Sequence, residues 1–139
     1  MSAPFIIVSA LVSAPLEKVW QAWTLPQHVM HWNQASPDWH CPLAEIDLQV
    51  GGKFSYRMAA KDESFQFDFS GAYQEIESQK ALKILLDDGR VWEVDFDQQD
   101  ANSTLVTERF EPENDNPREL QEGGWQAILN SFKSYTESF

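Results

Sequence analysis

Basic residues, cysteine and long apolar runs are all scarce in this sequence of 139 residues. Ten Lys and Arg stand against 22 Asp and Glu, which gives a formal net charge of −12 at pH 7. Nucleic acids and anionic membranes attract positively charged proteins, so neither is expected as a partner. The single cysteine, Cys41, excludes an internal disulfide and a zinc site built from several cysteines.

The apolar run from Phe5 to Val12 is far shorter than the roughly 20 residues that a membrane-spanning helix needs. No Lys or Arg precedes this run, and Glu17 and Lys18 follow it closely, which argues against a secretion signal. Together with the lone cysteine, this pattern predicts a cytoplasmic protein. Neither a phosphate-binding glycine loop nor a dinucleotide fingerprint is present, so no cofactor is expected.

Aromatic residues, in contrast, are abundant: the chain has six Trp, nine Phe and three Tyr. Each of these side chains can bury about 150 to 250 Å². The length suits one hydrophobic core, so we expect one domain over residues 1–139. The aromatic residues can either fill that core or line a pocket within it, and composition leaves both open.

The first third of the chain predicts one strand followed by two short helices. Residues 5–13 are rich in Ile and Val and suit a strand. Pro15 and Pro26 each stand where a helix can begin, and the helices are expected to end near Thr24 and Trp32. Residues 33–42 contain two prolines and mixed polarity, which predicts a loop.

Residues 43–110 alternate between apolar and polar side chains, which predicts about six antiparallel strands. A break in this alternation predicts a bulge near residues 74–75. Further along, a three-residue loop ending at Gly89 would place Ile84 opposite Trp92, and Gly89 would then adopt the left-handed conformation.

The length of the turn at residues 51–52 determines which side chains of the preceding strand face inward, and the sequence allows two lengths. A two-residue turn would send Asp47 and Gln49 inward, whereas a three-residue loop would send Leu48 inward, opposite Tyr56. The apolar-inward arrangement is favoured, because burying carboxylates without partners is costly.

The C-terminal segment predicts a long helix that begins with Asn116 as cap, Pro117 in the first position and Glu119 in the third. Gly123 and Gly124 each cost about 1 kcal/mol inside a helix relative to Ala, so we expect a bend or very close packing there. The apolar face of this helix consists of Trp125, Ile128, Leu129, Phe132 and Tyr135.

Four segments carry a family resemblance in their order and spacing: residues 20–32, with the sequence WQAWT at 20–24; residues 45–54; residues 69–76; and residues 124–129. The chain resembles the activator of heat-shock-protein-90 ATPase homologue family, within the START/SRPBCC superfamily. The resemblance implies an α+β helix-grip fold, like that of the birch pollen allergen. In this fold a curved antiparallel sheet of about six to seven strands surrounds the C-terminal helix, two short helices follow the first strand, and a cavity holds an apolar small molecule.

The alternation of the strands places many aromatic residues on one interior surface that faces the final helix. Rigid rings between a curved sheet and one helix are difficult to pack without voids, which favours a ligand cavity over a filled core. The leading hypothesis is therefore a protein that binds a small hydrophobic or amphipathic molecule, with Trp32 and Trp39 at the entrance. The predicted lining residues are Trp32, Trp39, Phe54, Tyr56, Phe67, Phe69, Trp92, Trp125, Leu129 and Phe132.

Two alternatives use the same sequence features differently. A polyketide cyclase-like enzyme, as the superfamily resemblance implies, would use the same cavity with Asp47 or Tyr56 as acid or base. A co-chaperone-like module would instead use the acidic surface to bind a protein partner. An enzyme is the less favoured interpretation, and either a monomer or a homodimer is compatible with the sequence.

Two motifs that contain histidine are not expected to form a metal site or a catalytic pair. His28 and His31 have a spacing that can bind a metal, but no acidic third ligand is near them in the sequence, so no metal site is expected. His40 precedes Cys41 directly, and adjacent side chains rarely point at each other, so a nucleophile and base pair is not favoured there.

Overall fold

The computed structural model describes residues 5–139, and these form one seven-stranded antiparallel sheet and three helices. The strand order in the sheet is β1-β7-β6-β5-β4-β3-β2. The elements in chain order are β1 (Ile6–Val12), α1 (Leu16–Thr24), α2 (Pro26–Trp32), β2 (Trp39–Ile46), β3 (Lys53–Ala60), β4 (Gln66–Glu77), β5 (Ala81–Leu86), β6 (Val91–Asp100), β7 (Ser103–Phe110) and α3 (Arg118–Ser138).

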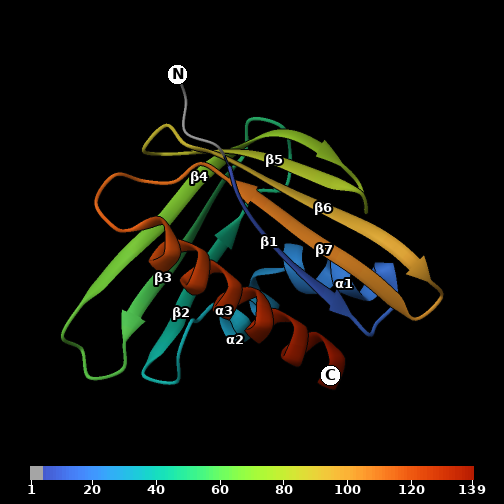
Figure 1. The fold of residues 1–139 in the computed structure, drawn as a ribbon, viewed down its shortest axis with the longest axis horizontal. Coiled ribbons are helices and arrows are strands. Elements are labelled where there is room, and N and C mark those ends of the chain that lie inside the picture. The colour runs from blue at the N-terminus through green and yellow to red at the C-terminus, as the bar shows by residue number, and fades with distance from the viewer. Residues whose placement is uncertain (1–4) are drawn as a thin grey trace.

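The sheet curls around the long helix α3 (Figure 1). Helix α3 packs against β1, whereas α2 packs against β2 at the opposite edge of the sheet, and α1 contacts β6 and β7. The two short helices therefore join the two edges of the curled sheet and close one side of its interior. This arrangement confirms the helix-grip fold, including the long C-terminal helix and the two short helices after the first strand.

Proline sets the boundaries of the two short helices, as expected. Pro15 precedes α1, and Pro26 is the first residue of α2. Leu25, between the helices, is extended with φ −99° and ψ 127°, because the residue before a proline is disfavoured in the helical region. The amphipathic pattern of α1 then turns Trp20 and Trp23 toward the sheet, where both rings lie against Phe96 of β6.

The register of the central strands confirms two expectations. Ile84 lies opposite Trp92, and Gly89 in the connecting loop has φ +93°. The pairing of β4 with β5 shifts between Tyr73 and Glu75, where the bulge is expected. These pairings place Ile84, Trp92 and Tyr73 on the same interior surface, where all three side chains are buried.

The expected loop over residues 33–42 is wrong at its C-terminal end, because β2 already begins at Trp39. Pro42 lacks a backbone N–H, and it falls where the pairing of β2 with β3 shifts, between His40 and Leu43. Strand β2 is also the edge of the sheet, where a missing donor is tolerated.

The connection between β2 and β3 is longer than expected. Ile46 pairs with Phe54, so six residues, 47–52, form the connection, and the predicted pairing of Leu48 with Tyr56 is wrong. The favoured apolar-inward arrangement is right for Ile46, which packs partly buried against the core, and wrong for Leu48, which is exposed like the polar side chains beside it. The exposed residues around this connection are Glu45, Asp47, Leu48, Gln49 and Val50.

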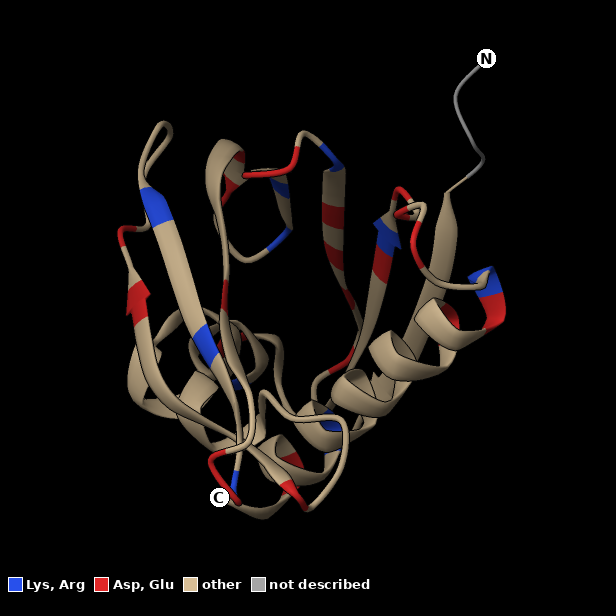
Figure 2. Ribbon diagram, turned by 90° about the vertical axis from the view of Figure 1, so that its left-hand side faces the viewer, with Lys and Arg blue, Asp and Glu red and all other residues tan. Residues whose placement is uncertain are grey.

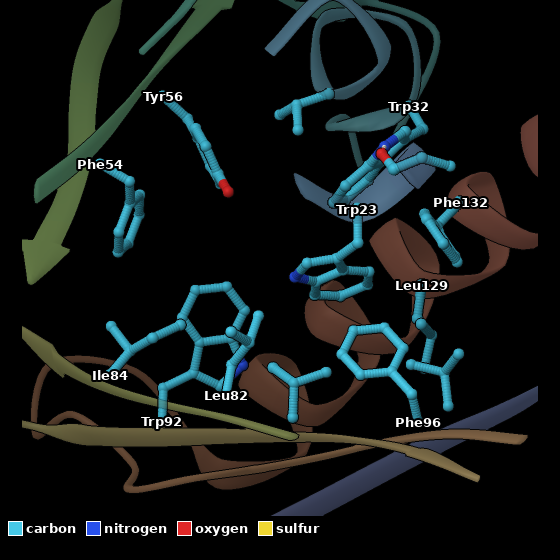
Figure 3. Close-up of a cluster of buried hydrophobic side chains, with 14 of the residues drawn as sticks. Trp23, Trp32, Phe54, Tyr56, Leu82, Ile84, Trp92, Phe96, Leu129 and Phe132 are labelled. Carbon is cyan, nitrogen blue, oxygen red and sulfur yellow. Dashed lines mark hydrogen bonds between the residues drawn. The ribbon is translucent and has the colours of Figure 1, made fainter. Parts of the chain in front are cut away.

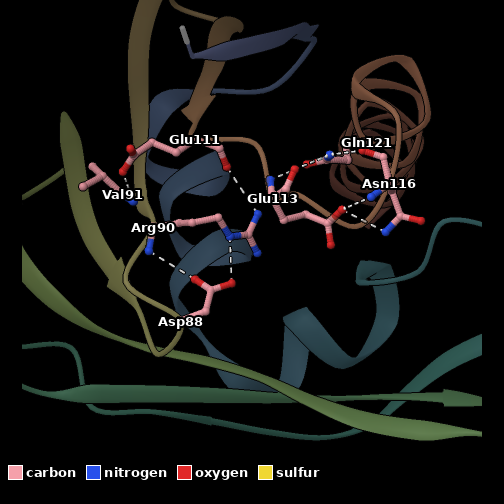
Figure 4. Close-up of polar contacts among 7 residues, drawn as sticks. All are labelled: Asp88, Arg90, Val91, Glu111, Glu113, Asn116 and Gln121. Carbon is pink, nitrogen blue, oxygen red and sulfur yellow. Dashed lines mark hydrogen bonds and ion pairs between the residues drawn. The ribbon is translucent and has the colours of Figure 1, made fainter. Parts of the chain in front are cut away.

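A polar network replaces the expected Asn116 cap of α3 (Figure 4). Pro117 takes the capping position, and its carbonyl accepts hydrogen bonds from the amides of Leu120 and Gln121. The Asn116 side chain instead donates to Glu113 at 2.9 Å. Gln121, which is buried, accepts from the Glu113 amide at 2.9 Å and donates to the Asn116 carbonyl at 2.8 Å. This network fixes the turn between β7 and α3.

Helix α3 runs without interruption through Gly123 and Gly124. Nothing lies within 4 Å of the position that a Cβ would occupy at either glycine, so the expectation of very close packing there is wrong. The predicted apolar face is confirmed: Leu129 and Phe132 are fully buried, and Trp125, Ile128 and Tyr135 pack partly buried beside them. Across residues 5–139, no helix combines the length and the apolar character that crossing a bilayer requires.

Candidate ligand cavity

An apolar cavity of about 160 Å³ lies between the sheet and the three helices. This volume is below the roughly 300 Å³ at which typical ligand pockets begin. It is nevertheless close to the volume of about 150 Å³ that accepts a benzene ring in a protein core. The residues that line it are Trp23, Trp32, Asn33, Tyr56, Met58, Phe67, Phe69, Trp92, Glu108, Trp125 and Ile128.

Three rings from three elements form one wall of the cavity. Trp92 of β6 lies 5.3 Å from Trp125 of α3 and 5.7 Å from Phe69 of β4, measured between ring centroids. Trp125 stacks on Phe110 at 3.8 Å, which fixes its orientation, and it meets Trp92 at 81°. Edge-to-face contacts of this kind are a favourable arrangement of aromatic rings.

Tyr56 projects from β3 toward the space between Trp23, Trp32 and Trp92 (Figure 3). Its side chain is buried, and burial is the main reason why the pKa of its hydroxyl lies well above the ordinary value, with Tyr73 adding to the shift. The Tyr56 hydroxyl therefore stays protonated at physiological pH, and its hydrogen-bond partner is the Tyr73 hydroxyl.

Glu108 is the only carboxylic acid among the lining residues. It lies on β7 in phase with Val106 and Phe110, so the alternation of the strand turns it inward, and its exposure is only 4%. The Trp92 indole N–H donates to one of its oxygens at 3.1 Å, and within residues 5–139 this is the one hydrogen bond that its side chain receives. Burial raises the pKa of Glu108 to about 8, although the Trp92 hydrogen bond opposes the shift.

The cavity brings together six of the ten predicted ligand-binding residues: Trp32, Tyr56, Phe67, Phe69, Trp92 and Trp125. The other four are Trp39, Phe54, Leu129 and Phe132. Phe54, Leu129 and Phe132 are packed within the core, at most 1% exposed. Trp39 lies outside, where its ring contacts Phe65 and Phe67.

Trp32 does not stand at an entrance, contrary to the expectation. Its indole is 2% exposed and donates a hydrogen bond to the carbonyl of Ala22 at 2.8 Å. Its ring also packs at 4.9 Å against Trp23 and at 4.9 Å against Phe132. Because one hydrogen bond and two ring contacts hold it between α1 and α3, Trp32 is a deep wall of the cavity.

Five lining residues were not among those expected from the sequence: Trp23, Asn33, Met58, Glu108 and Ile128. The position of Glu108 could have been found from alternation, since Thr104, Val106 and Phe110 mark the inward positions of the last strand. Asn33 directly follows α2, and its amide donates to the Met58 sulfur at 3.0 Å. That contact joins distant segments and leaves no signal in the sequence.

The remaining candidate residues lie outside the cavity. Asp47, the proposed acid or base of a cyclase, is exposed in the connection between β2 and β3. Cys41 is buried, and burial raises the pKa of its thiol, which is opposite to what a nucleophilic cysteine needs. His28 and His31 both contact Tyr135: His28 Nδ1 lies 2.6 Å from the Tyr135 hydroxyl, and His31 stacks on its ring. These two histidines therefore help to hold α2 against the end of α3.

Comparison with known proteins agrees with this geometry. The family model "Activator of Hsp90 ATPase homolog 1-like protein" matches residues 13–137. The solution structure of an AHSA1-like protein from Aeromonas hydrophila superimposes with a TM-score of 0.86 at 40% identity, over 95% of this chain and 92% of that one. Chr148 from Cytophaga hutchinsonii is 50% identical, with a TM-score of 0.82, over 96% of this chain and 92% of that one.

More distant structures share the fold alone. Protein CV1439 from Chromobacterium violaceum is 19% identical, with a TM-score of 0.82, over 99% of this chain and 100% of that one. No curated protein matches the chain.

Proposed function

Since the chain belongs to the family of Activator of Hsp90 ATPase homolog 1-like proteins, we propose that it uses the interior of the helix-grip fold to bind a small, mainly apolar molecule. The observation that carries the proposal is the cavity of about 160 Å³, with rings on most of its surface. Protein interiors are normally packed to high density, so a pocket of this size that reaches between large core side chains is unusual.

The volume and shape of the cavity limit the ligand. A space of about 160 Å³ accepts one six-membered ring with a short substituent, and it excludes a long acyl chain unless side chains move. Phe67 lines the cavity and is 44% exposed, so it is the lining residue most able to move for entry. Flat aromatic walls favour a flat or ring-shaped guest, because such a guest contacts several rings at once.

Binding is favoured over the cyclase-like alternative by the placement of the acid and base candidates. Asp47 lies outside the cavity, and Tyr56 retains its proton because its pKa is raised. A phenol that holds its proton at neutral pH is a hydrogen-bond donor and a poor general base.

Toluene binding, followed by NMR of the tryptophan indole N–H groups, tests the proposal. Four of the six tryptophans line the cavity, namely Trp23, Trp32, Trp92 and Trp125. Trp20 does not line it and serves as the internal control, whereas Trp39 contacts the lining residue Phe67 and is left out of the comparison. We expect saturable shifts in the four lining indoles and little change in Trp20. Absence of saturable shifts in the lining indoles would refute the proposal, as would an equal shift in Trp20.

A matched pair of variants sharpens this test. Ile128→Phe adds a ring at the cavity wall and should weaken toluene binding at least tenfold by occupying the space. Ile7→Phe makes the same substitution on β1, at a side chain that is 57% exposed and outside the cavity, and it should leave binding unchanged. Equal affinity in the two variants would place the toluene site elsewhere.

A further inference from the structure

We propose that the natural ligand carries a protonated amine, which Glu108 binds as its counter-ion inside the aromatic cavity. This inference rests on the proposed binding function and specifies the chemical class of the ligand. It starts from an imbalance in the site: ten of the eleven lining residues carry no ionisable group or only a phenol, and the eleventh is a carboxylic acid.

The ionised form of Glu108 favours a donor in the ligand over an acceptor. Trp92 supplies the single hydrogen bond to the Glu108 side chain from residues 5–139, so the carboxylate retains capacity to accept further bonds. Glu108 lines the cavity, which makes this capacity available to a guest. Lys and Arg are both missing from the lining residues, so the site offers no cationic partner for an anionic ligand.

The surrounding rings also favour a positively charged ligand. Trp23, Trp92 and Trp125 lie around the cavity, with centroids 5.3 to 6.3 Å apart between neighbours. The face of an indole attracts cations more strongly than any other aromatic side chain, and the effect grows where water is excluded. An ammonium group that enters this space would therefore exchange its hydration for one carboxylate and an aromatic surrounding.

The groups around Glu108 leave its charge uncompensated. Val8 on β1 and Val94 on β6 are its neighbours across the sheet, and the lining residues of α1, α2 and α3 are Trp23, Trp32, Asn33, Trp125 and Ile128. Tyr56 on β3 is the titratable group that interacts electrostatically with Glu108, and Tyr73 and Cys41 lie beside Tyr56. Arg109 and Glu93 face the other side of the sheet, where they pair with each other.

The net charge of the whole protein also favours a positively charged ligand. Asp and Glu are distributed over strands, loops and the start of α3, whereas Lys and Arg are few (Figure 2). A formal charge of −12 attracts cations at long range and raises their rate of encounter at low ionic strength.

Amine binding has a defined proton balance. Below pH 8 the free protein holds a proton on Glu108, because burial raises its pKa to about 8. When a protonated amine binds, Glu108 becomes a carboxylate and its proton leaves to solvent, while the amine keeps its own proton. The apparent affinity for the amine should therefore rise roughly tenfold from pH 6 to pH 7, since the ionised fraction of Glu108 rises by that factor.

Benzylamine, benzyl alcohol, benzoate and toluene form a matched set of probes, because they share the ring and differ in charge. Titration calorimetry at pH 7.5 should show benzylamine binding at least tenfold more tightly than toluene and benzyl alcohol, with benzoate weakest. Repeating the benzylamine titration at pH 7 in buffers of different ionisation enthalpy should show release of close to one proton per amine.

The variant Glu108→Gln isolates the carboxyl, with Glu75→Gln as an exposed control on β4. Glu108→Gln should lose the preference for benzylamine and the proton release but still bind toluene, which shows that its cavity is intact. Glu75→Gln should behave as the wild type. If toluene binds but benzylamine is no better, or if Glu108→Gln keeps the preference, the amine proposal is wrong. If toluene also fails in the wild type, the binding function itself is wrong.

Discussion

Trp23 lies where two differently packed ends of the aromatic interior meet. On one side, the rings of Trp32 and Phe132 each lie 4.9 Å from Trp23, and Phe96 lies 5.7 Å away. On the other side, Trp92 is 6.3 Å from Trp23, and the cavity occupies the space beyond. We refer to these as the filled end, made of Phe96 and Phe132, and the hollow end, made of Tyr56, Phe69, Trp92, Glu108 and Trp125. Trp23 and Trp32 line the cavity and also contact Phe132, so they form the boundary between the two ends.

The difference separates the part of the core that contributes most to stability from the part in which we propose that the ligand binds. The filled end consists of rings in close contact, which is how an interior gains most from burial and dispersion. The hollow end keeps a void and a buried carboxyl, and both reduce stability. Features that cost stability and persist at one place are typical of binding sites.

The variant Phe132→Ala should produce the largest effect, because it removes a fully buried ring from the filled end. We expect a loss of about 3–5 kcal/mol in the free energy of unfolding, measured by urea denaturation. Ile128→Ala on the same helix should cost only about 1 kcal/mol, since Ile128 is half-buried and already borders a void. Similar losses in the two variants would remove the distinction between the ends.

The pH dependence of stability should reveal the cost of Glu108 at the hollow end. Its pKa in the folded protein, about 8, lies above the ordinary value of 4.5, so the unfolded chain releases this proton first as the pH rises. The contribution of Glu108 is therefore fully present below pH 4.5 and is lost between pH 4.5 and about 8. In urea denaturation, the free energy of unfolding of the wild type should fall by roughly 3–4 kcal/mol relative to that of Glu108→Gln when the pH rises from 5 to 8.

The comparison with Glu108→Gln removes the contribution of the other acidic groups to the pH dependence of stability, because those groups titrate in both proteins. Glu75→Gln provides the matched control, and it should follow the wild-type profile because its side chain is exposed. Parallel profiles for wild type and Glu108→Gln would mean that Glu108 is ionised in the folded state. The hollow end would then carry a fixed negative charge.

Much of the fold could be predicted because local chemistry determines it. Pro15 and Pro26 set the starts of α1 and α2, and Gly89 with φ +93° sets the register of β5 against β6. The errors arose where distant contacts decide. Strand β2 begins early because β3 pairs with it despite Pro42, and the cap of α3 changes because Gln121 binds the preceding turn.

The site was less predictable, because alternation gives the facing of a side chain and says nothing about depth. Phe54, Leu129 and Phe132 face inward as expected, yet surrounding side chains leave them at most 1% exposed. Glu108 presents the opposite difficulty, because a Glu in a strand looks like a surface residue by composition. Only its phase with Val106 and Phe110 indicates that it is buried.

Replacing Gly123 or Gly124 by Ala should have the smallest effect and the opposite sign. Both glycines precede Trp125 at the hollow end, and a Cβ at either position would meet nothing within 4 Å. Each substitution should stabilise the protein by about 0.5–1 kcal/mol in urea denaturation, because Ala loses less backbone freedom in a helix. Gly71→Ala is the contrasting variant, since its Cβ would lie 2.6 Å from the Leu85 carbonyl oxygen, and it should destabilise. If Ala at 123 or 124 destabilises as Gly71→Ala does, the first turns of α3 are as tightly constrained as the filled end. The looser packing would then be confined to the cavity itself.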